Sequence, residues 1–143
     1  MLALEPLIVA RLQQHFAALG PAVKLDAKGW SDEGDRKVLP NRVAVLVRFA
    51  GTPQGAVTKV AAAITTGWAI ELRAKRGAKA AELLDSAFAE VLQALHEWVP
   101  APVAGRKWSH LAYQNTDPAD LIDDGVFGLS MYFQTAAIYP GKR

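Results

Sequence analysis

The last third of the chain carries a regular alternation of side chains that limits what this region can form. Large apolar residues recur at every second position, with small or polar residues between them. A period of two is typical of a strand with one buried face. The preceding Asp124-Gly125 is typical of a hairpin turn. The apolar set is Phe127, Leu129, Met131 and Phe133, and the intervening set is Gly128, Ser130, Tyr132 and Gln134.

The same region, residues 125–141, contains no charged residue, so a membrane-spanning helix must be considered. Its 17 residues are fewer than the roughly 20 that a helix needs to cross a bilayer. It also contains Gly, Ser, Gln, Thr and Pro, which break up the apolar surface that lipid requires. We therefore predict a strand here and no contact with a membrane.

Two segments have helical spacing instead. The first runs from about Glu5 to Leu19 and is followed by Gly20-Pro21, which would end a helix. The second runs from Ala78 to Trp98 and is followed by Pro100. The predicted apolar stripes are Leu4, Ile8, Leu12, Phe16 and Leu19 in the first helix, and Leu84, Phe88, Val91, Leu95 and Trp98 in the second.

Alternation also predicts strands over residues 42–50, 68–75 and 108–115, and a short edge strand over 23–27. In the 68–75 strand, Trp68 is expected to face the core, whereas Glu71 is expected to face solvent. A chain of 143 residues is long enough to bury its own core as one domain. The sequence thus predicts a compact α+β fold in a single domain spanning residues 1–143.

The segment from Lys28 to Asn41 differs from the rest because it is rich in charged residues and contains two glycines and a proline. Such a segment buries too little apolar surface to order itself, so we expect an exposed loop. It is either an unremarkable surface loop or an arm that contacts a partner. The candidate contact residues in it are Trp30, Arg36, Lys37 and Leu39.

No pattern in the sequence indicates catalysis or a bound cofactor. The chain has no cysteine, and it lacks a nucleophile elbow, a P-loop and a dinucleotide-binding glycine motif. His15, His96 and His110 stand apart from one another, and the aspartates between 117 and 124 lack the EF-hand spacing. We expect the histidines to be packing or surface residues and the aspartates to form turns. The prediction is therefore no enzyme, no metal and no cofactor.

Basic residues cluster near the end of the 68–75 strand, at Arg73, Lys75, Arg76 and Lys79. They form either a solvated surface or a contact with an acidic partner. The net charge of the chain is only +2, so contact with DNA should be non-specific at most.

The order of elements resembles the tail terminator proteins of Mu-like and lambda-like tailed bacteriophages. The resemblance rests on the N-terminal helix, the strand Trp68–Ala74 and the following helix with Leu83-Leu84-Asp85. It rests also on the closing turn Asp124-Gly125-Val126 and on Phe133-Gln134-Thr135. It implies two main helices packed on a curved, mostly antiparallel sheet. It further implies a hexameric ring that caps the tail tube, stops its polymerisation and presents a surface to the head–tail connector or stopper protein.

By this resemblance the chain is a virion protein of the tail, assembled in the host cytoplasm. Its partners would be other copies of itself, the tail tube protein and the connector, and DNA would pass through the ring. Two other interpretations stay open. The chain could be another phage neck or head–tail joining protein, or a small α+β ligand-binding domain or enzyme.

Overall fold

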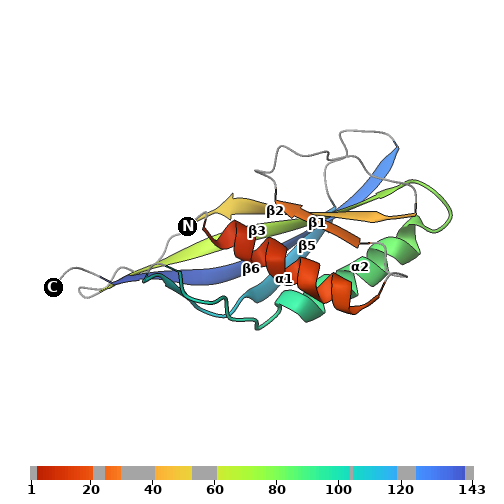
Figure 1. Cartoon of the computed structure of the whole chain (residues 1–143). Helices are drawn as coiled ribbons and strands as arrows, with labels where there is room; N and C mark the ends of the chain where they lie inside the picture. The colour runs from red at the N-terminus through yellow and green to blue at the C-terminus, as the bar shows by residue number, and fades with distance from the viewer. Residues whose placement is uncertain are drawn as a thin grey trace.

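The computed structural model describes residues 3–20, 25–29, 41–52, 61–103, 105–118 and 125–140. These residues form an α+β fold, as predicted (Figure 1). The helices are α1 (Leu4–Ala18) and α2 (Ala80–Leu95). The strands are β1 (Leu25–Gly29), β2 (Val43–Gly51), β3 (Ala61–Lys75), β4 (Lys107–Trp108), β5 (Ala112–Pro118) and β6 (Val126–Pro140).

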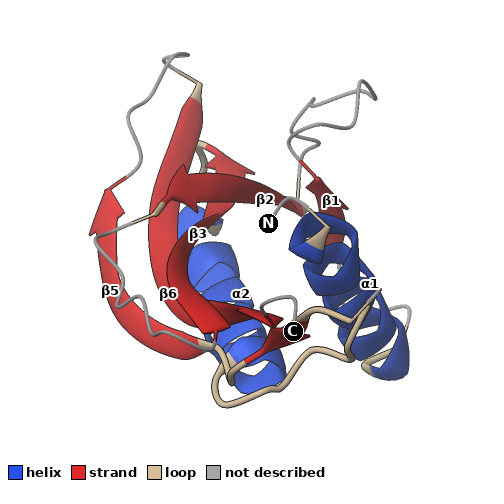
Figure 2. Cartoon of the chain, turned by 90° about the vertical axis from the view of Figure 1, so that its left-hand side faces the viewer, coloured by secondary structure: helices blue, strands red, loops and turns tan. Residues whose placement is uncertain are grey.

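All the strands belong to one sheet, which curls around the two helices (Figure 2). The strand order is β1–β2–β3–β6–β4, and β5 also pairs with β6. β1 runs parallel to β2, and the other pairings are antiparallel. The prediction of a curved, mostly antiparallel sheet with two helices is confirmed. One face of the sheet packs on the helices, and we call the opposite face, on which no described helix lies, the helix-free face.

The alternating segment forms β6, which pairs with β3 along its full length, from Ala61↔Pro140 to Lys75↔Val126. Met131 and Phe133 are fully buried on the helix side, as predicted. Phe127 is 42% exposed, so the buried face ends earlier than the pattern indicates. β5 pairs with β6 only as far as Leu129, so no described strand lies beside Phe127 on that flank.

α1 has the predicted stripe, with Leu4, Ile8, Leu12 and Phe16 buried against the sheet and α2. Leu19 lies beyond the end of the helix and is exposed, contrary to its predicted place in the stripe. The helix stops there because Gly20 has a φ of +93°, a conformation that ends helices and that residues with a side chain rarely adopt.

α2 is shorter than predicted at both ends, and Trp98 lies outside it. His96 is extended and Glu97 has a φ of +65°. The Glu97 N–H donates to the Leu111 carbonyl at 2.7 Å, and the Leu111 N–H donates to the Trp98 carbonyl at 2.9 Å. The backbone therefore pairs with a distant segment instead of continuing the helix.

The same contact breaks the strand predicted over 108–115 into β4 and β5. Both pieces pair with β6, but Leu111 between them bonds to the segment that follows α2. Ser109 holds the break in place, because its N–H donates to the Ala136 carbonyl and its Oγ accepts from the Ala136 N–H.

The charged loop begins later than predicted. Lys28 and Gly29 belong to β1, where they pair with Leu46 and Val47 of β2. Residues 30–40 lie outside the described residues. No helix in the described part of the chain is long and apolar enough to cross a membrane.

Candidate assembly surfaces

The helix-free face of the sheet carries a compact charged cluster on β2 and β3. Glu71 points to this face, as predicted, but it is buried, with 9% of its surface exposed. It is flanked in the sheet by Leu46 and Ser130, which are themselves buried. The Glu71 carboxylate accepts a hydrogen bond from Arg73 at 2.7 Å and lies 3.7 Å from Arg48 Nε. One acidic group thus holds two arginines on this face.

Glu71→Gln should lower the free energy of unfolding by about 1–2 kcal/mol, because both arginines lose their charged partner. Their partial exposure to water keeps the cost below that of a fully buried pair. Urea denaturation followed by circular dichroism measures the loss. Glu82→Gln is the matched control on the exposed first turn of α2, where a change of less than about 0.5 kcal/mol is expected. A Glu71→Gln protein as stable as the wild type would contradict the coupling of the three side chains.

The predicted basic cluster lies at the connection between β3 and α2, but its four residues have different surroundings. Arg73 is largely covered and bonded to Glu71. Lys75, Arg76 and Lys79 are exposed. The Arg76 guanidinium stands over the ring of Phe127, 4.7 Å from its centroid. This end of the molecule therefore presents a basic and aromatic surface to which Arg73 contributes little.

The other predicted contact residues, Trp30, Arg36, Lys37 and Leu39, lie outside the described residues. Their contact with a partner stays a prediction.

The histidines that the structure describes are used in packing or lie at the surface. His15 Nε2 is 2.8 Å from Glu90 Oε2 and links α1 to α2. His96 Nδ1 accepts a hydrogen bond from the Tyr113 N–H at 3.3 Å, and His110 is exposed. Among the described residues no group of three or more His, Asp or Glu side chains is placed to hold a metal ion.

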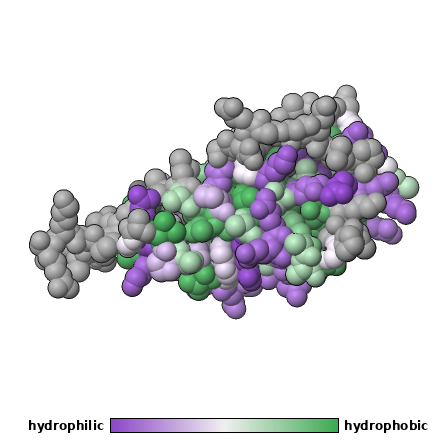
Figure 3. Space-filling view, viewed as in Figure 1, coloured by the Kyte–Doolittle hydropathy of each residue, from purple (hydrophilic) through white to green (hydrophobic). Residues whose placement is uncertain are grey.

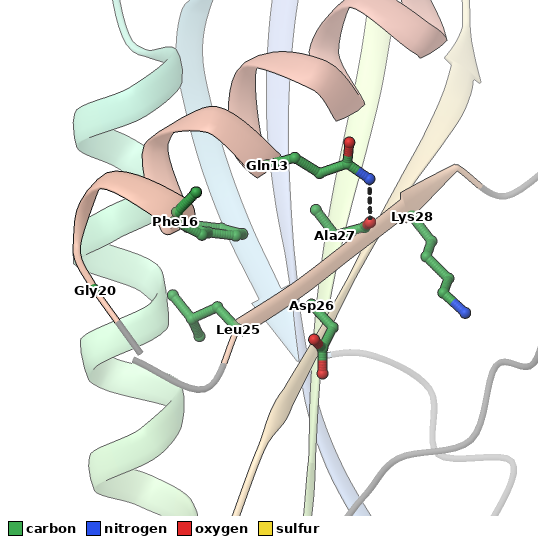
Figure 4. A pocket seen from close by; sticks show the side chains of 8 residues that line it. Gln13, Phe16, Gly20, Leu25, Asp26, Ala27 and Lys28 are labelled. Atoms are coloured by element: carbon green, nitrogen blue, oxygen red, sulfur yellow. Dashed lines mark hydrogen bonds between the residues drawn. The ribbon is translucent and has the colours of Figure 1, made fainter. Parts of the chain in front are cut away.

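A groove between α1 and the edge strand β1 is the feature that the sequence did not reveal. It has a volume of about 510 Å³. Phe16 and Leu25 face each other across it, and the Gln13 amide donates to the Ala27 carbonyl at 3.2 Å (Figure 4). Its lining consists of Gln13, Phe16, Ala17, Gly20, Leu25, Asp26, Ala27 and Lys28.

The acidic residue of the groove is already paired within the subunit. Arg42 donates two hydrogen bonds to the Asp26 carboxylate, both at 2.7 Å. These bonds lower the pKa of Asp26, against the opposing effect of partial burial, and raise the pKa of Arg42. The pair neutralises the Asp26 carboxylate, and Lys28 is the other charged residue of the lining. On the face shown in Figure 3, hydrophobic and hydrophilic residues are intermingled.

Comparison with known proteins finds similarity at the level of the fold. No family model matches the sequence, and no curated protein matches it. The structure is similar to a chain from the virion of a native gene transfer agent particle, with a TM-score of 0.65 and 16% sequence identity. The alignment covers 95% of each chain. What the two chains share at this level of identity is the fold.

Proposed function

We propose that this chain is a structural protein of a tailed, phage-like virion and that it acts as the tail terminator. The observation that carries the proposal is the fold similarity to a virion chain over 95% of both proteins. The sequence resemblance to tail terminators points to the same class of protein. In this role the chain has no reaction to catalyse and works through its surfaces.

The expected assembly is a cyclic hexamer that sits on the upper end of the tail tube. A closed ring requires two different surfaces on each subunit, which meet head-to-tail. The remaining exposed surfaces would contact the tube protein on one side and the connector or stopper protein on the other. Lys75, Arg76 and Lys79 are candidates for these contacts, and DNA passing through the ring would meet them without sequence preference.

Removing the gene from the producing strain tests this role through tail length. A terminator stops tube polymerisation, so its loss should give tails longer than wild type that carry no heads. Electron microscopy of negatively stained lysates measures both properties, and expression of the wild-type chain from a plasmid should restore them. Unattached tails of normal length would identify a neck or head–tail joining protein instead. Normal particles would contradict any essential role in the tail.

A further inference from the structure

We propose that the groove beside β1 receives an extended strand from a second copy of this chain, and that this contact closes the ring. The donor is the outer end of the β3–β6 ribbon, Ala61–Thr66 paired with Thr135–Pro140, which we call the arm. The inference deepens the proposed function, on which the ring itself rests.

The receiving edge has backbone groups that face away from the sheet. The Ala27 carbonyl accepts the Gln13 side chain, so it points away from β2 and toward the groove. The N–H and carbonyl of one residue in a strand point to the same side, so the Ala27 N–H faces the groove too. An exposed edge of this kind is a template on which another strand can pair. The Gln13 amide occupies the position that a neighbouring strand's N–H would take.

The opposite edge of the sheet is protected against such pairing. On β5, the Tyr113 N–H donates to the His96 side chain and not to another strand. The register of β5 is also interrupted between Tyr113 and Asn115, and the strand ends at Pro118. An irregular register and a proline are devices that keep an edge strand from pairing, and β1 has neither of them. The two edges therefore differ, and β1 is the one suited to receive a strand.

The arm has the form and the charge that this groove accepts. β2 pairs with β3 only as far as Gly67, so among the described residues no strand lies beside Ala61–Thr66 on that side. A strand of 15 residues is about 50 Å long, whereas α2 spans about 24 Å. The arm accordingly runs past both helices (Figure 1). It contains no charged residue, so it brings no further charge into a groove where Asp26 is paired with Arg42 and Lys28 is the other charged residue of the lining.

Arm and groove are different surfaces, so their contact is head-to-tail. Each copy gives its arm to one neighbour and receives an arm from the other. Such contacts form a ring when the rotation between subunits closes. Two identical edges meeting each other would instead give an isolated dimer.

Ala17→Arg tests the receiving side. Ala17 is exposed at the wall of the groove, so arginine should fit the isolated subunit and block an incoming strand. The matched control is Ala18→Arg, at the next position of α1, which is also exposed but outside the groove. Mass photometry over a concentration series should show half-assembly of Ala17→Arg at a concentration at least about tenfold higher than wild type. Ala18→Arg should assemble as wild type does, and equal assembly of the two variants would overturn the proposal.

Cysteine cross-linking identifies which segment occupies the groove. The chain has no natural cysteine, so the cross-links form only at the introduced positions. Ala17→Cys protein mixed with Thr65→Cys protein should be linked into dimers by a short bismaleimide. Neither variant should link to itself, and the double variant should give a ladder that ends at six chains. Linking of Ala17→Cys to Asn115→Cys would show that sheet edges meet directly and would overturn the arm as donor.

The remaining outcomes separate this inference from the proposed function. Wild-type rings that form without an Ala17–Thr65 link would overturn the arm contact and leave the terminator role intact. A wild-type protein that stays monomeric at its highest soluble concentration and gives no link would overturn it as well. The tail-length experiment tests the terminator role independently of the contact between arm and groove.

Discussion

Phe133→Ala should lower the free energy of unfolding by about 3–5 kcal/mol, whereas Phe127→Ala should cost about 1 kcal/mol or less. The two phenylalanines lie on the same strand and the same face of β6. Phe133 is fully buried and meets the ring of Tyr113 edge-on, at 5.7 Å between centroids. Its truncation leaves a cavity between the sheet and α2. Phe127 is 42% exposed and loses mainly its contact with Arg76.

Urea denaturation followed by circular dichroism measures both variants on the same scale. For a domain of this size, a loss of 3–5 kcal/mol lowers the melting temperature by roughly 10–15 °C. Because the residue type, the strand and the substitution are identical, the difference reports mainly burial, with a smaller contribution from the ring contacts to Tyr113 and Arg76. Similar losses at the two positions would mean that the N-terminal end of β6, around Phe127, is covered in solution.

The contrast between these residues shows what alternation can predict. A period of two identifies a strand and the face that turns inward, and β6 confirms both. It carries no information on how far neighbouring elements extend over that face. Among the described residues β5 pairs with β6 only as far as Leu129, and residues elsewhere in the chain set that boundary.

Long-range backbone contacts explain the errors at the end of α2 and in the 108–115 segment. Both arise from the pairing of Leu111 with Glu97 and Trp98. The helical stripe continues through Trp98 in the sequence, so no local pattern marks the helix end at Leu95. Burial of Glu71 is a related case. Alternation gives its direction correctly, but it does not show that Glu71 lies between the buried Leu46 and Ser130 of two other strands.

The groove could not be predicted because it depends on the placement of β1 beside α1. Gln13 lies off the apolar stripe of α1, where a polar residue needs no explanation. Its bond to Ala27 appears only when the edge strand is positioned. The basic residues at the end of β3 could be found from sequence, but only the structure separates Arg73, bonded to Glu71, from the exposed Lys75.

Trp68→Ala should be among the most damaging single substitutions in the chain, with an expected loss of about 3–5 kcal/mol. Trp68 is fully buried in the middle of β3 and meets Phe49 edge-on at 5.4 Å between ring centroids. Its indole N–H donates to Thr66 Oγ1 at 3.1 Å, and that hydroxyl donates to the Thr135 carbonyl at 3.0 Å. Truncation therefore leaves a large cavity and also removes the donor to a buried hydroxyl.

Trp98→Ala is the matched comparison, since the sequence places both tryptophans in the core. Trp98 is only partly buried, after the end of α2, with the Arg11 guanidinium 5.6 Å from its ring centroid. Its loss should cost about 1–2 kcal/mol, the value for partial burial and a cation–π contact. Urea midpoints read by circular dichroism avoid the fluorescence change that either substitution causes. If Trp98→Ala proved as damaging as Trp68→Ala, Trp98 would belong to the central core. The partial burial of Trp98 after the end of α2 at Leu95 would then be contradicted.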